Sequence, residues 1–325
     1  MSLIPAETAA STLDFRAVLV TGGAGFVGRK MVRRLRAALP AMSRVVVVGR
    51  SNVIVPNCDF LAFDLEHGAS VDGVVAAARP DLIVHLAAQS FAVGAAGATW
   101  GTNLAGSLNL ARAIGKYVPE AVTLYVSSAE VYGLAFNDGP VTEETVCKPQ
   151  SAYSRSKLAA EEMFADVLAP SSQLIVCRPS NHSGGGQEVK FALPSFAQQI
   201  VAGQDEIHVG NLEAQRDFVH VDDVVDAYHD ILARTGELGP RTTLNVCSGQ
   251  TRAVGDLLHR MIELAGSHAN VVVDADRYRS ADIPVASMAS DLLRSLTGWA
   301  PRRSMDDMLN DVLDHARARA AEGGS

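Results

Sequence analysis

Tyr153 and Lys157 stand four residues apart in the segment 151–168, whose sequence predicts a helix. Because side chains at this spacing share one helix face, the phenol and the ammonium would be neighbours. A free phenol has a pKa of about 10, and a nearby ammonium stabilises the phenolate and lowers that pKa. Ser128, which ends a predicted strand, could hydrogen-bond the same substrate oxygen. Together these residues predict proton transfer at a carbonyl group, whereas the Tyr–Lys pair alone would equally suit a solvated helix face.

A second set of candidates is a run of glycines. Gly22, Gly25 and Gly28 follow the apolar run 16–21 and precede the helical stretch 29–39. In this setting the first glycine permits a tight turn, the second admits a diphosphate to the backbone, and the third lets helix and strand pack closely. The N–H groups at the helix N-terminus would bind the phosphates. We therefore predict a dinucleotide site here, with Phe26 and Val27 beside the glycines.

The end of the second predicted strand, at 44–49, bears on which dinucleotide binds. An acid there would bind the ribose 2′-hydroxyl of NAD, whereas an arginine suits the 2′-phosphate of NADP. The chain has Arg50 and no acid at this place. We predict NADP(H) in preference to NAD(H), and the competing interpretation of Arg50 is a solvated loop cation.

The remaining predicted cofactor contacts follow the third and fourth strands. Asp64 is placed to meet the adenine, although an aspartate after a strand is also a common helix cap. The other contacts in this group are Leu65, Leu86, Ala87 and Ala88.

These residues require strands and helices in alternation. Apolar runs at 16–22, 44–49, 58–64, 81–88, 121–128 and 173–179 lack polar alternation, which predicts strands buried on both faces. With helical stretches between them, they predict a doubly wound parallel α/β sheet whose ligand lies at the carboxyl ends of the strands. We predict a Rossmann domain at 14–179 and a smaller α/β substrate-binding domain at 180–320, with some return of chain to the first. The helix at 221–234 and the strand at 242–248 are expected in the second, less regular part.

Four motifs carry a resemblance to a known family. TGGAGFVG (21–28), HLAA (85–88), SSAEVYG (127–133) and YSRSK (153–157), in this order, resemble the extended short-chain dehydrogenase/reductases over about residues 15–320. The resemblance implies a Rossmann domain, a nucleotide-sugar domain and a Ser128–Tyr153–Lys157 catalytic set, with hydride passed by a nicotinamide. It also implies that Asn103 supports the fold behind the lysine, and that the chain dimerises through the helices at 99–117 and 151–168.

The second half resembles one branch of that family. RPSNHSGGGQ (178–187), GNLEAQRDFVHVDDVVDAY (210–228), NVCSG (245–249) and RSADIP (279–284) are similar to GDP-6-deoxymannose reductases and GDP-mannose 4,6-dehydratases, and the second and third are more similar to the reductases. By this resemblance Asn181, Arg216 and Arg279 should line the nucleotide-sugar site, and Lys190 and Gln187 are further candidates. Guanidinium groups match diphosphate oxygens, although each arginine could instead form a surface ion pair.

Glu130 keeps two reactions open. In the sugar 4,6-dehydratases a glutamate two places after the catalytic Ser or Thr removes the C5 proton, and Glu130 holds that place after Ser128. Ala129 replaces the aspartate of nucleoside-diphosphate-glucose dehydratases, and the arginine-rich insertion of GDP-mannose dehydratases is missing. Both departures favour reduction of a GDP-4-keto-6-deoxymannose at C4, giving GDP-rhamnose. The alternatives are GDP-mannose 4,6-dehydration, another nucleotide-sugar epimerase or dehydratase activity, and a binding protein without turnover, which the intact catalytic set argues against.

Composition limits the partners and the compartment. The 325 residues carry 28 basic and 36 acidic side chains, a net charge of −8, which argues against binding to nucleic acid or an anionic membrane. Apolar runs stay shorter than the roughly 18 residues of a membrane helix. The four cysteines have no CxxC spacing, and Cys177 and Cys247 lie in apolar runs, which predicts buried free thiols and a cytoplasmic protein.

No metal site is expected. The nine histidines contain no HxxxH or HExxH pair. His85 lies in a buried strand and is interpreted as a hydrogen-bonded core residue, whereas His182, in a glycine-rich loop, could contact a sugar. Asp222 and Asp223 follow a strand and are interpreted as a helix cap and a first-turn acid.

Overall fold

The structure is a computed structural model that describes residues 13–50, 55–89, 96–274 and 283–323. Its centre is a seven-stranded parallel sheet in the order β10-β6-β5-β4-β1-β2-β3. The strands are β1 (Ala17–Thr21), β2 (Arg44–Gly49), β3 (Asp59–Ala62), β4 (Leu82–His85), β5 (Val122–Val126), β6 (Gln173–Pro179) and β10 (Arg241–Val246). This is the doubly wound, Rossmann-like α/β fold that the apolar runs predict.

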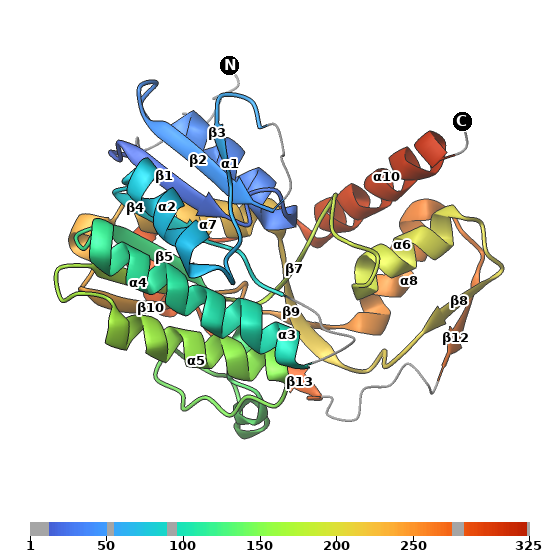
Figure 1. Ribbon diagram of the computed structural model, residues 1–325. Coiled ribbons are helices and arrows are strands. Elements are labelled where there is room, and N and C mark those ends of the chain that lie inside the picture. The colour runs from blue at the N-terminus through green and yellow to red at the C-terminus, as the bar shows by residue number, and fades with distance from the viewer. Residues whose placement is uncertain (1–12, 51–54, 90–95, 275–282, 324–325) are drawn as a thin grey trace, which may run out of the picture.

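Helices cover both faces of the sheet (Figure 1). Val18 and Val20 of β1 pack on one face with α1 (Phe26–Ala38) and α7 (Val221–Leu232). Leu19, between them, packs on the other face, where the helices are α2 (Gly68–Ala78), α4 (Ser107–Tyr117) and α5 (Ala152–Val167). Since both faces of β1 are buried, its sequence is apolar without alternation.

The second part of the chain forms a smaller body beside the sheet, at the right of Figure 1. Its own hydrophobic cluster joins α6 (Ala192–Val201), β8 (Glu206–Val209), α8 (Val254–Ala265) and α10 (Met305–Gly323). Four short strands lie between it and the large sheet: β7 (Asn181–Ser183), β9 (Gln215–His220), β11 (Thr251–Ala253) and β13 (Val285–Ala286). A fifth, β12 (Asn270–Val273), lies within the smaller body. Strand β9 pairs with β7, β11 and β13, and β12 pairs with β8.

Two elements expected in the second part belong to the Rossmann-like first part instead, one as a strand of the large sheet and one as a helix on its face. Strand β10 pairs in parallel with β6, and helix α7 packs against α1. The physical reason is burial: Leu244 and Val246 of β10 and Tyr228 of α7 lie in the same cluster as the central strands. The chain therefore returns to the sheet after residue 220, and the predicted bounds 14–179 and 180–320 stay a prediction.

The helix expected at 99–117 is not uniform. It begins as α3 (Ala96–Trp100), widens into a π-helical turn, η1 (Gly101–Gly106), and continues as α4. Such π turns are rare and occur often at functional sites. The remaining short elements are the 3₁₀ turns η2 (Ala129–Val131), η3 (Leu134–Asp138) and η4 (Thr235–Glu237) and the helix α9 (Asp291–Thr297).

Helix α5 begins with a reciprocal cap. The Ser151 hydroxyl accepts from the Ser154 N–H at 3.0 Å, and the Ser154 hydroxyl accepts from the Ser151 N–H at 3.0 Å. These bonds satisfy two N–H groups that a helix start otherwise leaves free. The cap fixes the first turns of α5, which carry Tyr153 and Lys157.

Several predictions from single residue types are confirmed. All four cysteines are free thiols, and Cys177 and Cys247 are buried. His85 is fully buried and hydrogen-bonded. The cap of α7 differs from the prediction, because the His220 side chain accepts from the Asp222 N–H, so Asp222 and Asp223 both belong to the first turn. Within the described ranges, no helix has the length and apolar character needed to cross a membrane.

Candidate active site

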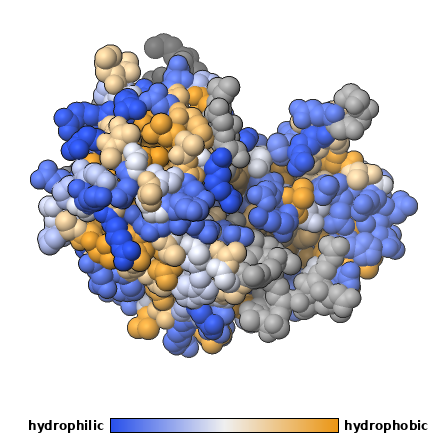
Figure 2. All heavy atoms as spheres, viewed as in Figure 1, coloured by the Kyte–Doolittle hydropathy of each residue, from blue (hydrophilic) through white to orange (hydrophobic). Residues whose placement is uncertain are grey.

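A cleft of about 330 Å³ lies at the carboxyl ends of the central strands. Its walls come from the turn after β1, the segment after β5, the start of α5 and residues 179–191. Figure 2 shows the surface indented between the large body and the smaller one. The cleft therefore has one wall from the sheet and one from the chain that leads to the second part.

The glycine turn (residues 22–28) is shaped for close backbone approach. A Cβ at Gly28 would collide with the carbonyl oxygen of Gly22, and one at Gly22, whose φ is +70°, would lie 2.8 Å from the Ala87 nitrogen. Gly25 is the N-cap of α1 and no side chain caps it, so the helix presents its first N–H groups at the cleft. This turn fits the diphosphate of a dinucleotide.

The catalytic candidates converge in this cleft. Ser128, Tyr153 and Lys157 all line it, and the Ser128 hydroxyl hydrogen-bonds the Tyr153 phenol. The Lys157 ammonium donates to the Val126 carbonyl at 2.5 Å and lies 4.3 Å from the centroid of the Tyr125 ring. One strand end and one helix start thus bring together the groups that the sequence predicts.

The electrostatics differ from the expectation. Burial raises the pKa of Tyr153 well above its usual value, the Glu130 carboxylate adds to that effect, and the hydrogen bond with Ser128 opposes it. Burial also lowers the pKa of Lys157 to about 7, against the opposing charge of Glu161. The predicted net lowering of the tyrosine pKa toward neutrality is therefore wrong for this structure, because desolvation of the buried phenol dominates over nearby charges.

Below the cleft, a buried ion pair holds the end of β5. Arg178 donates to Glu161 at 2.6 Å, and both side chains are less than one-tenth exposed. The Ser127 hydroxyl also donates to Glu161, and Arg178 donates to the Tyr132 hydroxyl at 3.1 Å. Ser127 precedes Ser128 directly, so this network anchors the backbone that places the catalytic hydroxyl. A carboxylate four residues after Lys157 was a usable sequence signal, and the prediction missed it.

The predicted cofactor contacts divide into two groups. Gly22, Gly25, Phe26, Val27, Gly28, Leu86 and Ala88 line the cleft, and Ala87 donates its N–H to the Thr21 hydroxyl beside them. Arg50 is exposed after β2, and the Leu65 side chain is buried against Gly106. Asp64 accepts from the Glu66 N–H at 3.1 Å and contacts His67, outside the cleft lining. Cofactor contacts by these last three residues stay a prediction.

Only two of the predicted sugar-site residues line the cleft. Asn181 and Gln187 line the cleft together with Glu130. Lys190 pairs with Glu188 at 2.8 Å, and Arg216 donates to the Ile283 carbonyl at 2.7 Å. Arg279 lies outside the described residues.

The segment 180–191 brings His182 and Gln187 to the cleft, and the sequence indicates both only as secondary candidates. The His182 ring stacks on Phe26 of the glycine turn, with centroids 6.3 Å apart, and its Nδ1 donates to the Ser180 carbonyl at 2.9 Å. Gln187 donates to the His182 carbonyl and accepts from Ser183. A hydrogen bond from the Gly185 N–H to Asp311 ties the segment to α10. These contacts connect the glycine turn to the second part.

Comparison with known proteins decides the family. Residues 18–247 match the model of the NAD dependent epimerase/dehydratase family. The chain belongs to this family. The resemblance that the motifs carry is thereby confirmed.

The chain is similar over most of its length to two relatives of known activity and to one solved structure. It is 31% identical to GDP-6-deoxy-D-mannose reductase of Pseudomonas aeruginosa, over 94% of this chain and 98% of the relative. It is 29% identical to GDP-6-deoxy-D-talose 4-dehydrogenase of Aggregatibacter actinomycetemcomitans, over 82% and 86% of the two chains. The solved structure of RMD from Pseudomonas aeruginosa complexed with NADPH superposes with a TM-score of 0.79 and 29% identity, covering 93% of this chain and 99% of that one.

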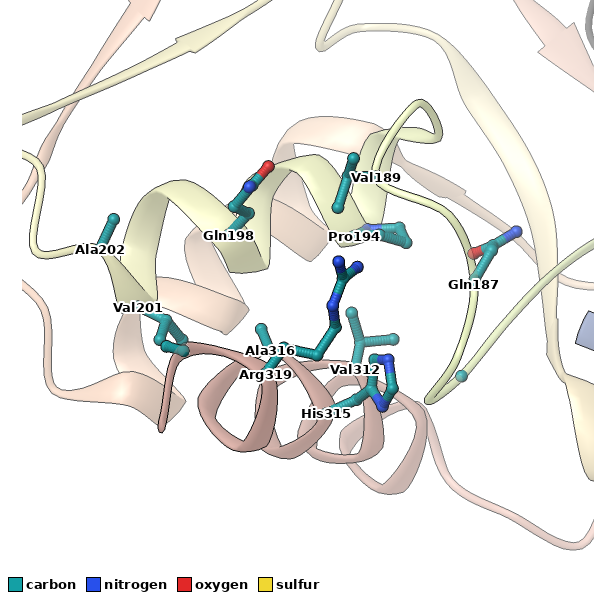
Figure 3. A pocket seen from close by; sticks show the side chains of 12 residues that line it. Gln187, Val189, Pro194, Gln198, Val201, Ala202, Val312, His315, Ala316 and Arg319 are labelled. Carbon is teal, nitrogen blue, oxygen red and sulfur yellow. The ribbon is translucent and has the colours of Figure 1, made fainter. Parts of the chain in front are cut away.

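A second cavity of about 260 Å³ lies between α6 and α10 of this family member (Figure 3). Arg319 extends across it from α10 toward Pro194 of α6, and Val201 and Val312 form apolar parts of the wall. Its described lining residues include no serine, tyrosine, lysine or carboxylate. The cleft, which has all four, is therefore the candidate active site. Within the described ranges, no group of three or more His, Cys, Asp or Glu side chains is placed to hold a metal ion.

Proposed function

We propose that the chain is a nucleotide-sugar reductase that converts a GDP-4-keto-6-deoxymannose to GDP-rhamnose with NADPH. One observation carries the proposal: similarity to a GDP-6-deoxy-D-mannose reductase extends over nearly the whole of both chains. The cleft supports it, because Ser128, Tyr153 and Lys157 share one cavity with the glycine turn. The reaction consumes one hydride and one proton and turns the C4 ketone into an alcohol.

NADP(H) is the preferred cofactor in this proposal, with NAD(H) as the alternative. The solved relative named RMD binds NADPH, and Arg50 follows β2 where a 2′-phosphate would lie. The glycine turn and the uncapped start of α1 would hold the diphosphate. Bound NADPH supplies the hydride that goes to C4.

The side chains supply the proton and the orientation. Tyr153 keeps its proton at neutral pH, since burial raises its pKa, and so it serves as the general acid toward the C4 oxygen. The Ser128 hydroxyl, already bonded to that phenol, orients the ketone between them. A charged Lys157 beside the site stabilises the phenolate that remains after proton transfer.

The nucleotide sugar would extend from the catalytic groups toward the second part. Asn181 and Gln187 stand along that path in the cleft. Arg216, Arg279 and Lys190 are proposed for the diphosphate and the base, because guanidinium and ammonium groups complement phosphate oxygens. We also propose a homodimer through the α3–α4 and α5 helices and a cytoplasmic location, which the free cysteines support.

Dehydration of GDP-mannose is the second candidate, and the position of Glu130 favours it. This carboxylate lines the cleft and acts electrostatically on Tyr153, so a base stands beside the acid–base residue. Elimination of water needs such a base for the C5 proton, whereas ketone reduction does not.

The deciding experiment follows nicotinamide absorbance with purified protein, NADPH and GDP-4-keto-6-deoxymannose. Stoichiometric loss of NADPH supports the reductase, and analysis of the product at C4 separates rhamnose from its C4 epimer, 6-deoxytalose. Keto-sugar formation from GDP-mannose, with the cofactor unconsumed, would support the dehydratase instead. Glu130→Gln sharpens the result: it should reduce a dehydratase about 10³-fold and a reductase less than about tenfold.

A further inference from the structure

A row of buried polar side chains runs behind the active site, and the mechanism above uses none of them. Thr21 ends β1, His85 ends β4, and Ser107 begins α4. All three are at most 1% exposed. The Thr21 hydroxyl lies 2.6 Å from His85 Nδ1, and His85 Nε2 lies 2.9 Å from the Ser107 hydroxyl. His85 therefore links β1, the strand that leads into the glycine turn, to the start of helix α4.

The partners fix where each proton lies. Ser107 donates its only hydroxyl proton to the Asn103 carbonyl at 2.6 Å, so its oxygen must accept from His85 Nε2–H. Nδ1 then carries no proton and accepts from the Thr21 hydroxyl. The Thr21 oxygen in turn accepts from the Ala87 N–H at 3.1 Å. Every proton in this row has one acceptor, and only the neutral Nε2–H tautomer of His85 satisfies all of them.

The row continues into the catalytic helix through Asn103, in the π turn η1. Its side-chain oxygen accepts from the Gln89 N–H at 2.7 Å, and its side-chain nitrogen donates to Ser156 at 3.0 Å. Ser156 donates to the Tyr153 carbonyl at 2.8 Å. The same row thus bonds to Ala87, a predicted cofactor contact, to Gln89 two residues later, and to the first turn of α5.

The surroundings keep His85 uncharged. Burial lowers its pKa to about 3, and the positive charge of Lys157 acts in the same direction. The rings of Tyr125 and Phe164 lie 5.6 and 5.8 Å from the imidazole, and the Lys157 ammonium contacts the Tyr125 ring. A second positive charge here would be desolvated and next to a cation.

We propose that His85, as the neutral Nε2–H tautomer, is a positioning residue that sets the first turn of α5, and with it Tyr153, relative to the glycine turn. The rigid row fixes the distance between the proton donor and the cofactor-facing backbone. This inference rests on the proposed function for its kinetic part only. The proton arrangement itself is a property of the folded chain and is testable without turnover.

The first test is ¹⁵N–¹H correlation NMR of histidine side chains in wild-type protein, with the His85 signals assigned by their loss in His85→Gln. The expected spectrum shows a protonated Nε2, an unprotonated Nδ1 and no titration between about pH 5 and pH 8. An Nδ1–H tautomer, or titration of His85 in this range, overturns the proposal whether or not the chain is a reductase.

The second test measures kcat per NADPH-binding site and the NADPH dissociation constant. His85→Phe keeps the ring packing and removes both hydrogen bonds, and it should lower kcat about tenfold with NADPH affinity within about twofold. His85→Gln, which can still donate to Ser107, should recover part of that loss. If His85 only supports folding, the variants should lower the fraction of protein molecules that bind NADPH and leave kcat per binding site unchanged. That result would contradict the proposal.

A matched pair of serine variants distinguishes the loss of a hydroxyl in this row from the loss of any other buried hydroxyl. Ser107→Ala removes the acceptor of His85, and Ser172→Ala removes an equally buried hydroxyl that donates to the Pro119 carbonyl at 2.8 Å. We expect kcat per site to fall about threefold or more in the first variant and to stay within about 1.5-fold in the second. Equal effects would mean that loss of any buried hydroxyl suffices, and the positioning role would be rejected. If wild-type protein turns over no substrate, the reductase proposal fails while the NMR result still stands.

Discussion

The two walls of the cleft are built in different ways. On the sheet wall, Ser128 follows β5 and Tyr153 and Lys157 lie in the first turns of α5, above the buried Glu161–Arg178 pair. On the other wall, Asn181 lies in the short strand β7, which pairs with β9, and Gln187 lies in a loop that hydrogen bonds with Ser183 and His182 hold together. The groups that perform chemistry are thus fixed by the large sheet and a long helix, and the groups proposed to choose the substrate stand on short strands and a loop.

The difference matters because the two tasks tolerate different amounts of motion. Proton and hydride transfer lose efficiency steeply when the reacting groups move by about 1 Å. Recognition of a long, charged nucleotide sugar spreads over several contacts, each of modest worth. A member of this family can therefore keep one catalytic wall and change its substrate through loop residues alone.

The largest expected effect tests the catalytic wall. Tyr153→Phe removes the proton donor and keeps the ring, so kcat for the keto sugar should fall about 10³-fold. NADPH affinity, measured by fluorescence titration, should stay within about twofold, because the glycine turn holds the diphosphate. Equal losses of turnover and cofactor binding would show that Tyr153 supports the fold of the site and is not its acid.

The next effect tests the support beneath that wall. Glu161→Gln leaves Arg178 buried without a counter-charge, and we expect the free energy of unfolding to fall by about 3–5 kcal/mol. The control is Arg260→Gln, which breaks a pair with Asp306 in which both side chains are almost half exposed. That change should cost far less, because solvent screens an exposed ion pair. Urea unfolding curves compare the two, and similar losses would contradict the structural weight given to the buried pair.

The pH dependence gives a smaller but more specific effect. Lys157 has a pKa of about 7, so it loses its charge as the pH rises through that value, while Tyr153 stays protonated. The kcat/KM for ketone reduction should therefore fall above about pH 7, by up to about tenfold per pH unit. Lys157→Arg carries a permanent charge, and its profile should lack this basic limb whatever its absolute rate. A limb that persists in the arginine variant would assign the titration to another group.

The sequence predicted the catalytic wall well, because its signals are local. Strands buried on both faces show unbroken apolar runs, glycines mark a turn with no room for a Cβ, and a spacing of four residues puts Tyr153 and Lys157 on one helix face. These local signals do not show which strands pair when they lie far apart in the sequence. The run 241–246 reads as a strand, yet only packing of Leu244 and Val246 with the central cluster shows that it extends the large sheet.

Burial and partner choice explain the other misses. The sign of the tyrosine pKa depends on how completely the phenol is desolvated, which the spacing to Lys157 does not reveal. The π turn at 101–106, which contains Asn103, has no distinctive composition, so the sequence does not predict it. Arg178 lies in an apolar strand run and Glu161 follows Lys157 by four residues, but the pairing of these two side chains emerges only when α5 packs against β6.

The smallest expected effect belongs to Arg216, which lies outside the cleft lining and is proposed for the diphosphate or the base of the nucleotide. Arg216→Gln should raise KM for the GDP sugar about tenfold, the equivalent of one charge-assisted hydrogen bond, and leave kcat within about twofold. Arg302→Gln makes the same change in net charge at an exposed place outside the cleft lining and should alter neither constant. A fall in kcat comparable to that of Tyr153→Phe would mean that the residues proposed to bind the nucleotide also position the reacting groups. Substrate recognition and catalysis would then act as one unit, and substrate choice could not change without loss of rate.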